Sequence, residues 1–526
     1  MLKFFKSNLF FFLLLATAVF SLYGKSINFD LTYHDDDSLI LEKADFLSDF
    51  KNIPKLFLTS CYYSEDFQYY RPVLNLSFLL ETSIFGLNTK VYHITNIILF
   101  ILALYLMYIF LYKLKLNRTV LKVLILLISV HPILTSSAVW LPVRNDTLLS
   151  VFIFLSFICF IKYLEKNSTK NLLLYILFFT IALFTKETTL LMLFLYPVSV
   201  ICFNYKLDKK EIYKNILIFV PILLIYFSLR TFSVQSVDIK YYFDNVFLCF
   251  DNFVTGVSTY LYNFFIPTHI PIMLYDINLA IGNIILDSFL LIFISILYYK
   301  KILNIKILFF SIFWFVTGLF STFLLPDYVY LNHRLLISLP GILLISAYII
   351  DKLITKDNKI IKYLLLLSII LFSYFFICSF NLQNKYRDKY EYWNNAYLSA
   401  PKYHGTNYWL AHLYMEQDIY SKAKDFLIKA NEYGNNRYLS DLALIYYREG
   451  DMDKAEEFYN KSIEYGINKA QCYRNLSVIY LKRDDDINKA IEYAKLAVKQ
   501  EPYDDKYKRY LLILENKSEN VKKRNI

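Results

Sequence analysis

Long apolar runs alternate with short polar loops along most of the chain. Runs near twenty residues are long enough to cross a bilayer as helices. The pattern predicts an all-α, polytopic membrane domain with eleven spans, at 8–23, 91–112, 123–141, 147–161, 171–185, 188–205, 215–230, 281–299, 307–325, 335–350 and 363–380. The stretch 241–280 is also apolar, but its Asp244 and Asp251 favour a re-entrant or interfacial segment over a further span.

The first apolar segment follows Lys3 and Lys6, which is the layout of a signal peptide or of a membrane anchor. No small-x-small cleavage pattern follows it at Tyr23-Gly24-Lys25, and further spans come after it. We therefore expect an uncleaved anchor.

Basic residues gather in alternate loops between the predicted spans. Besides Lys3 and Lys6, these are Lys113, Lys115, Arg118, Lys122, Lys162, Lys166, Lys170, Lys206, Lys209, Lys210, Lys214, Lys300, Lys301, Lys306, Lys352, Lys356, Lys359 and Lys362. Cytoplasmic loops carry such an excess of Lys and Arg, so we expect these loops in the cytoplasm. The first large loop, 24–90, then faces the extracytoplasmic side, and so does everything after the eleventh span. We expect an integral, multi-pass protein of a membrane such as the bacterial inner membrane.

The chain changes character near residue 381 and becomes a helical repeat. Three helical pairs are predicted at 407–434, 436–466 and 470–502, followed by a closing helix at 503–516 and a frayed basic tail at 517–526. Small residues recur at matching positions in the two helices of each pair: Ala411, Ala423, Ala443, Ala455, Ser477 and Ala490. This spacing is typical of tetratricopeptide (TPR) repeats. We therefore divide the chain into a membrane domain, 1–380, and a TPR-like α-solenoid, 381–520, whose concave face suits a protein partner.

Composition removes other classes of function. The net charge is +11, but the basic residues lie in membrane loops, so we expect no nucleic-acid partner. The 48 tyrosines and 47 phenylalanines agree with a membrane-filling composition and need no binding role. The six cysteines show neither metal-ligand spacing nor a disulfide framework.

A cluster of three acids, Asp35 to Asp37, lies in the first extracytoplasmic loop, in the sequence YHDDDS. One interpretation is a solvated turn that begins a helix near Ser38. A second is a carboxylate base, because crowding by other acids and a low dielectric constant raise a carboxyl pKa. A third is a divalent-cation site that uses Asp35 and Asp36. The motif alone leaves all three open.

Several charged and polar residues beside the spans share the predicted extracytoplasmic side, and in or near a membrane each is a candidate for function. Four are cationic: Arg71, Arg144, Lys186 and Arg334. Their polar neighbours are His93, His131, Asp146, Glu187 and His333. Singly, these are equally well explained as local ion pairs or snorkelling side chains. Together, they suggest a site for a lipid phosphate or pyrophosphate. We interpret His93 and Asn96, one turn apart, as buried hydrogen-bonding residues.

The order of motifs resembles a known family. The segments are NFDLTYHDDDSLI, YYRPVLNLSFLLETSIFGLNTKVYHITNIILF, HPILTSSAVWLPVRNDTLL, FTKETTLL and LNHRLLISLPG. In this order, and with a repeat-bearing tail, they resemble multi-span glycosyltransferases of the GT-C fold that carry C-terminal TPR repeats, namely the transmembrane-and-TPR O-mannosyltransferases and their bacterial relatives. The resemblance covers nearly the whole chain.

The resemblance implies transfer of a sugar from a polyprenyl-phosphate carrier. The acidic pair taken to be catalytic in such enzymes falls on Asp35 and Asp36, and Asp37 becomes an extra acid. Arg144, Lys186 and Arg334 fall on family basic positions, where they, with Arg71, are expected to bind the donor phosphate. The chain departs from the family pattern at Ser136 and His333, where glutamate is usual.

We therefore expect a membrane glycosyltransferase that moves a sugar, with mannose a candidate, to a protein or glycan acceptor on the extracytoplasmic side. We expect an Asp base and no organic cofactor, with a divalent metal ion as an alternative. Two other classes stay open. One is a non-catalytic scaffold whose TPR repeats recruit partners in envelope assembly, and the other is a transporter of lipid-linked sugar.

Overall fold

The computed structural model describes residues 7–62, 69–205, 209–234, 244–275, 280–320, 329–356, 359–483, 485–501 and 504–524. In these ranges the regular structure is helical, apart from an isolated antiparallel bridge between Leu274 and Tyr330. The all-α prediction is confirmed. The chain divides into two compact units, Met1–Tyr392 and Trp393–Ile526, so the division falls somewhat beyond residue 380.

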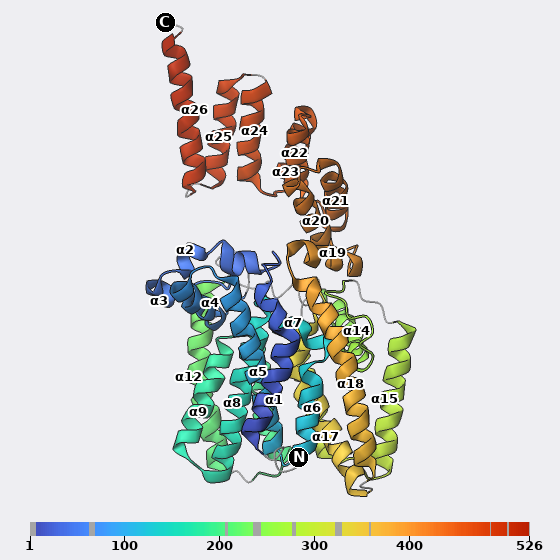
Figure 1. Cartoon of the computed structure of the whole chain (residues 1–526). Coiled ribbons are helices and arrows are strands. Elements are labelled where there is room, and N and C mark those ends of the chain that lie inside the picture. The colour runs from blue at the N-terminus through green and yellow to red at the C-terminus, as the bar shows by residue number, and fades with distance from the viewer. Residues whose placement is uncertain are drawn as a thin grey trace. The chain divides into compact units, whose positions relative to one another are not determined.

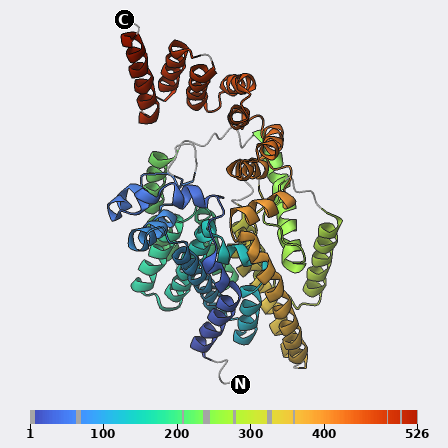
Figure 2. The same ribbon diagram turned by 45° about the horizontal axis from the view of Figure 1, so that its top comes forward.

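The first unit is a bundle of long helices, as Figures 1 and 2 show. Its main helices are α1 (Asn8–Tyr23), α4 (Pro72–Phe85), α5 (Thr89–Lys113), α6 (Arg118–Ser129), α8 (Arg144–Lys166), α9 (Thr169–Leu183), α11 (Leu195–Cys202), α12 (Lys209–Ser233), α14 (Val246–Phe265), α15 (Ile281–Tyr299), α16 (Ile305–Phe320), α17 (Leu339–Lys356) and α18 (Ile360–Leu382). Short helices α2 (Ala44–Leu47) and α3 (Ile53–Leu56) lie at the end of the bundle opposite the start of α1 (Figure 1).

Six helical segments of the described chain are long and apolar enough to cross a membrane. They are Asn8–Asn28, Thr89–Lys113, Leu141–Lys166, Ile281–Tyr299, Asn332–Lys356 and Ile360–Tyr386. A bent pair, Arg118–Ser129 with Pro132–Val139, makes a seventh if the two helices count as one span. The chain is thus a multi-pass membrane protein.

The sequence predicted eleven spans, whereas six or seven segments of the described chain qualify. Four of the predicted spans fall on shorter apolar helices: Thr169–Leu183, Thr189–Cys202, Leu217–Ser233 and Ile305–Phe320. The helix α14, within the uncertain stretch 241–280, is not among the segments that qualify as spans. Its interfacial placement stays a prediction.

The predicted span 123–141 is broken in its middle. The axes of its two helices differ by 63°. The break lies at His131, whose backbone is extended (φ −71°, ψ 129°) and which precedes Pro132. Proline has no N–H to donate and disfavours helical backbone in the residue before it, which explains why the apolar pattern continues while the helix does not.

The predicted cytoplasmic loops meet at one end of the bundle. Lys113, at the end of α5, pairs with Glu165 near the end of α8 at 3.2 Å. Lys122 of α6 donates to the carbonyl of Ser7, just before α1, at 3.1 Å. These basic helix ends therefore lie together, as the charge pattern of a single membrane face requires.

Helices α16 and α17 approach each other through small residues. A β-carbon on Gly341 would lie 2.3 Å from the carbonyl oxygen of Ser311, and one on Gly318 would lie 2.2 Å from the hydroxyl of Ser338. Small residues allow close helix packing in membranes, where burial of apolar surface gives little driving force. This contact fixes the start of α17, next to His333.

The second unit is a stack of helical pairs. They are α20 (His404–Glu416) with α21 (Tyr420–Tyr433), α22 (Leu439–Glu449) with α23 (Met452–Glu464), and α24 (Lys469–Arg483) with α25 (Ile487–Gln500). The six small residues noted at matching positions are all fully buried. The last helix, α26 (Asp505–Arg524), packs against α25 through Leu514 and its neighbours, and it continues into the stretch predicted as a frayed tail.

We predict that Gly341→Ala destabilises the bundle by roughly 1–3 kcal/mol, because the added methyl group has no room beside the α16 backbone. Thermal unfolding in detergent measures this. The matched control is Gly24→Ala, where nothing lies within 4 Å of the new β-carbon and the backbone is helical. Equal unfolding temperatures for the two variants would contradict the close α16–α17 contact.

Candidate functional site

The acidic loop, which we define as residues 29–38, is held by the side chain of Asp36. One of its carboxylate oxygens accepts hydrogen bonds from the N–H (2.7 Å) and the hydroxyl (3.0 Å) of Thr32. The other accepts from the N–H of His34 at 3.1 Å. The side chain of Asp36 is buried, at 1% exposure. Asp36 therefore organises the loop from within.

Asp35 differs from Asp36 in both backbone and exposure. Its φ is 71°, a left-handed conformation that is uncommon for a residue other than glycine, and its side chain is partly exposed. Among the described residues, no donor forms a hydrogen bond or ion pair with its carboxylate. The loop thus presents the Asp35 carboxylate while it buries that of Asp36.

Burial changes the pKa values of Asp36 and Asp37. It raises the pKa of Asp36 to about 7, although the hydrogen bonds from Thr32 and His34 oppose this. Burial raises the pKa of Asp37 as well, and the charge of Asp35 adds to the effect. At neutral pH the loop is therefore poised between protonation states.

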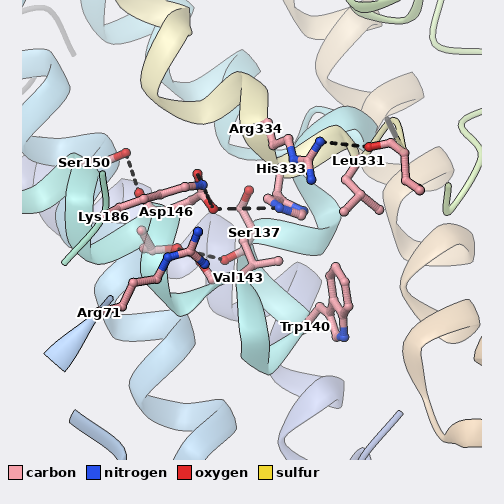
Figure 3. Close-up of polar contacts among 12 residues, drawn as sticks. Arg71, Ser137, Trp140, Val143, Asp146, Ser150, Lys186, Leu331, His333 and Arg334 are labelled. Atoms are coloured by element: carbon pink, nitrogen blue, oxygen red, sulfur yellow. Dashed lines mark hydrogen bonds and ion pairs between the residues drawn. The ribbon is translucent and has the colours of Figure 1, made fainter. Parts of the chain in front are cut away.

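A buried ion pair forms the centre of a second group. The Lys186 amine lies 2.7 and 2.8 Å from the two carboxylate oxygens of Asp146, and both side chains are at least nine-tenths buried. His333 approaches the same carboxylate at 3.7 Å. Figure 3 shows Lys186, Asp146 and His333 in a row, with Arg71 and Arg334 nearby. Residues from α8, from the turn after α9 and from the segment before α17 are thus brought together.

Glu187, the neighbour of Lys186, joins two arginines. Arg71 pairs with it at 3.2 Å and Arg230, from α12, at 3.6 Å. Burial alone would raise the pKa of Glu187, but Arg71 and Arg230 hold it below its usual value. The sequence interpretation missed Arg230, although a single arginine near the end of an apolar helix was a signal that it could have used.

The two groups form one cationic cluster, which we define as Arg71, Lys186, Arg230 and Arg334. Electrostatic interactions link them, since Arg71 acts on Asp146 and Glu187, and Arg334 acts on Lys186. Two carboxylates, Asp146 and Glu187, face these four cations. The described part of the chain thus brings cationic side chains from four segments together, in surroundings of low dielectric constant.

Arg144 does not join this cluster. It is fully buried, and its guanidinium pairs with Glu81 at 2.6 Å and donates to Asn96 at 2.7 Å and to the carbonyl of Tyr92 at 2.9 Å. The guanidinium also lies over the ring of Phe78. Arg144 thus links α4, α5 and α8 apart from the cluster, and its role in phosphate binding stays a prediction that these contacts do not favour.

The remaining predicted residues have structural surroundings. The Nε2–H of His131 donates to the carbonyl of Phe264 (3.0 Å), its Nδ1 accepts from the N–H of Ile133, and its ring stacks on that of Phe264. His93 is 2% exposed and packs edge-on against Phe29. Ser136 is buried and contacts Tyr386. His333 alone of these touches the ion-pair centre.

Trp140 and Tyr62 connect the acidic loop with the cationic cluster. The Trp140 ring packs on both His34 (5.1 Å between centroids) and His333 (5.6 Å), and its N–H donates to the hydroxyl of Thr32 at 3.0 Å. Burial raises the pKa of Tyr62, Asp35 raises it further and Arg71 lowers it. Asp35 and Arg71 therefore lie near a common neighbour.

The acids fit a metal ion poorly. Both carboxylate oxygens of Asp36 already accept hydrogen bonds from the loop. No group of three or more His, Cys, Asp or Glu side chains suitable for a metal ion lies within the described ranges. A cation shared by Asp35 and Asp36 would compete with these donors for the oxygens of Asp36, and such a site stays a prediction.

Comparison with known proteins identifies part of the second unit. Residues 437–465 match the family model of the tetratricopeptide repeat. This match covers α22 and α23, so the C-terminal unit contains a TPR motif. No curated protein and no solved structure matches the chain, and no glycosyltransferase family is identified.

We predict that breaking the Asp146–Lys186 pair is costly. Asp146→Asn or Lys186→Met alone should destabilise the protein by about 3–5 kcal/mol, since each leaves a buried charge without its partner, and the double variant should recover much of this loss. Unfolding in detergent measures the cycle. The half-exposed pair Lys113–Glu165 is the control, with an expected effect below about 1 kcal/mol. Additive effects at Asp146 and Lys186 would contradict the pairing.

A second prediction concerns pH. Because the pKa of Asp36 is raised to about 7 in the fold, from about 4 in an unfolded chain, its contribution to stability is full below pH 4 and is lost as pH rises through 7. Asp36→Asn should remove this part of the pH dependence. The control Asp45→Asn, at an exposed side chain, should leave it unchanged. Unfolding temperatures between pH 4 and 8 provide the measurement. Identical profiles for wild type and Asp36→Asn would refute the assignment.

Proposed function

We propose that the chain is a membrane glycosyltransferase of the GT-C type, which transfers a sugar from a polyprenyl-phosphate carrier to a protein or glycan acceptor on the extracytoplasmic side. The observation that carries the proposal is the cationic cluster, which gathers guanidinium and ammonium groups in surroundings of low dielectric constant. Such groups suit phosphate oxygens, so the cluster supports an anionic ligand.

The membrane domain supports a lipid-linked ligand. A phosphate on a polyprenyl chain combines an anion with a long apolar tail, and the bundle combines a cationic cluster with six or seven helices suited to a bilayer. The basic helix ends around Lys113 and Lys122 lie together at the other end of α5 and α6. The positive-inside rule favours the cytoplasm for that end, which supports an extracytoplasmic position for the cluster and the acidic loop.

Asp35 is the better candidate for the base. A general base must reach the proton that it removes, and the partly exposed Asp35 carboxylate meets this need, whereas the Asp36 carboxylate is buried and engaged. This revises the sequence interpretation, which treated the two acids alike. In the proposal Asp36 shapes the loop that presents Asp35.

The proposed step is a displacement at the anomeric carbon. Asp35 takes the proton of the acceptor hydroxyl as that oxygen bonds to the anomeric carbon. The bond from this carbon to the phosphate oxygen breaks, and its electron pair stays on the lipid phosphate. Arg71, Lys186, Arg230 and Arg334 stabilise the charge that develops there.

The test uses the purified full chain in nanodiscs with a polyprenyl-phosphate-linked mannose and a mixture of envelope proteins and glycans as acceptors. Asp35→Asn should lower release of polyprenyl phosphate at least about 100-fold, since general bases contribute that much or more, and should leave the unfolding temperature unchanged. Asp37→Asn is the matched control and should stay active. Normal transfer by Asp35→Asn would rule out this base.

The competing scaffold function is favoured by one observation, the TPR match at residues 437–465. It predicts that the wild-type chain transfers no sugar from any polyprenyl-phosphate donor. It also predicts that substitutions in α22 and α23 abolish envelope assembly while Asp35→Asn has no effect. Cells that carry each variant distinguish the two functions.

A further inference from the structure

The last part of the first unit folds back onto the acidic loop. We call residues 383–392, which lead from α18 towards the repeats, the connector. The Lys25 amine donates to the side-chain carbonyl of Asn384 at 2.8 Å, across 359 positions of sequence. The backbone N–H of Asp30 donates to the carbonyl of Arg387 at 2.8 Å. The connector thus also contacts Lys25 and Asp30, which precede the three acids in the sequence.

The acidic loop has a backbone that needs support. Tyr33 and Asp35 both have left-handed backbone, with φ of 56° and 71°. This backbone conformation is uncommon for residues other than glycine. It persists where the surrounding structure holds it. The hydrogen bonds to Asp36 hold the loop from inside, and the connector holds it from outside.

Two connector side chains contact Tyr33 and His34, the residues immediately before Asp35. The Tyr392 hydroxyl lies 2.6 Å from Nδ1 of His34, and the two rings pack at 5.4 Å between centroids. The Lys389 amine lies over the ring of Tyr33, 4.6 Å from its centroid. Trp140, which follows the short helix α7 (Thr135–Val139), packs on both His34 and Tyr392 and so fixes this arrangement.

We propose that the connector is a positioning element for the proposed base, in which Tyr392 and Lys389 hold the left-handed turn that presents the Asp35 carboxylate. The effect of the connector on catalysis rests on the proposed function. The contacts by which the connector holds the acidic loop do not. Because the chain continues from the connector into the repeats, displacement of the connector changes the geometry of the acidic loop.

Hydrogen–deuterium exchange of the full chain in nanodiscs tests the positioning itself. Tyr392→Phe removes the hydroxyl and keeps the ring, and amides of residues 30–42 should then exchange about fivefold faster, as expected for loss of one hydrogen bond. Tyr390→Phe, in the same helix α19 (Lys389–Ser399) but at an exposed ring, is the matched control and should leave exchange unchanged. Lys389→Met is a second variant and should also accelerate exchange in this segment.

Equal exchange in Tyr392→Phe and Tyr390→Phe would overturn the proposal, and so would acceleration spread evenly over the whole bundle. The kinetic measurement uses polyprenyl-phosphate-linked mannose. Tyr392→Phe should lower kcat about tenfold and leave KM for this donor unchanged, because the cationic cluster is untouched. A raised KM with unchanged kcat would contradict positioning of the base. If the wild-type chain transfers no sugar but exchange accelerates as expected, the proposed function fails and the connector's hold on the loop stands.

Discussion

The ion pair between Lys186 and Asp146 is the constraint on which the site depends. A buried charge at the end of an apolar bundle is costly unless it is paired, so these side chains must meet. Their meeting fixes α8 against the turn that follows α9. It also places Glu187 beside Arg71 and Arg230, and His333 beside Asp146. The cationic cluster is a consequence of how these charges are accommodated.

The acidic loop depends on a different interaction, the hydrogen bonds that the Asp36 carboxylate accepts from the loop. Asp36 uses its oxygens to satisfy backbone N–H groups, and this leaves Asp35 on a left-handed turn with its carboxylate partly exposed. Adjacent and chemically identical residues therefore differ in burial, hydrogen bonding and backbone conformation. Trp140 lies between the loop and His333, so the loop and the ion-pair centre share one aromatic wall.

Apolar pattern and charge were enough to predict much of the architecture. The all-α class, the membrane helices, the gathering of basic helix ends and the helical pairs of the second unit follow from periodicity and composition, because each depends on local sequence. Span number did not follow, since hydropathy does not report where a helix breaks, as at Pro132.

The sequence by itself determined which residue types lie near the site: three consecutive acids, and cations beside the spans. Only the tertiary structure decided which of them act together. It pairs Arg144 with Glu81 and Asn96, adds Arg230 of α12 to the cationic cluster, and gives Asp35 and Asp36 different surroundings. The physical reason is that pairing, burial and backbone conformation depend on contacts between segments far apart in sequence, which no local pattern records.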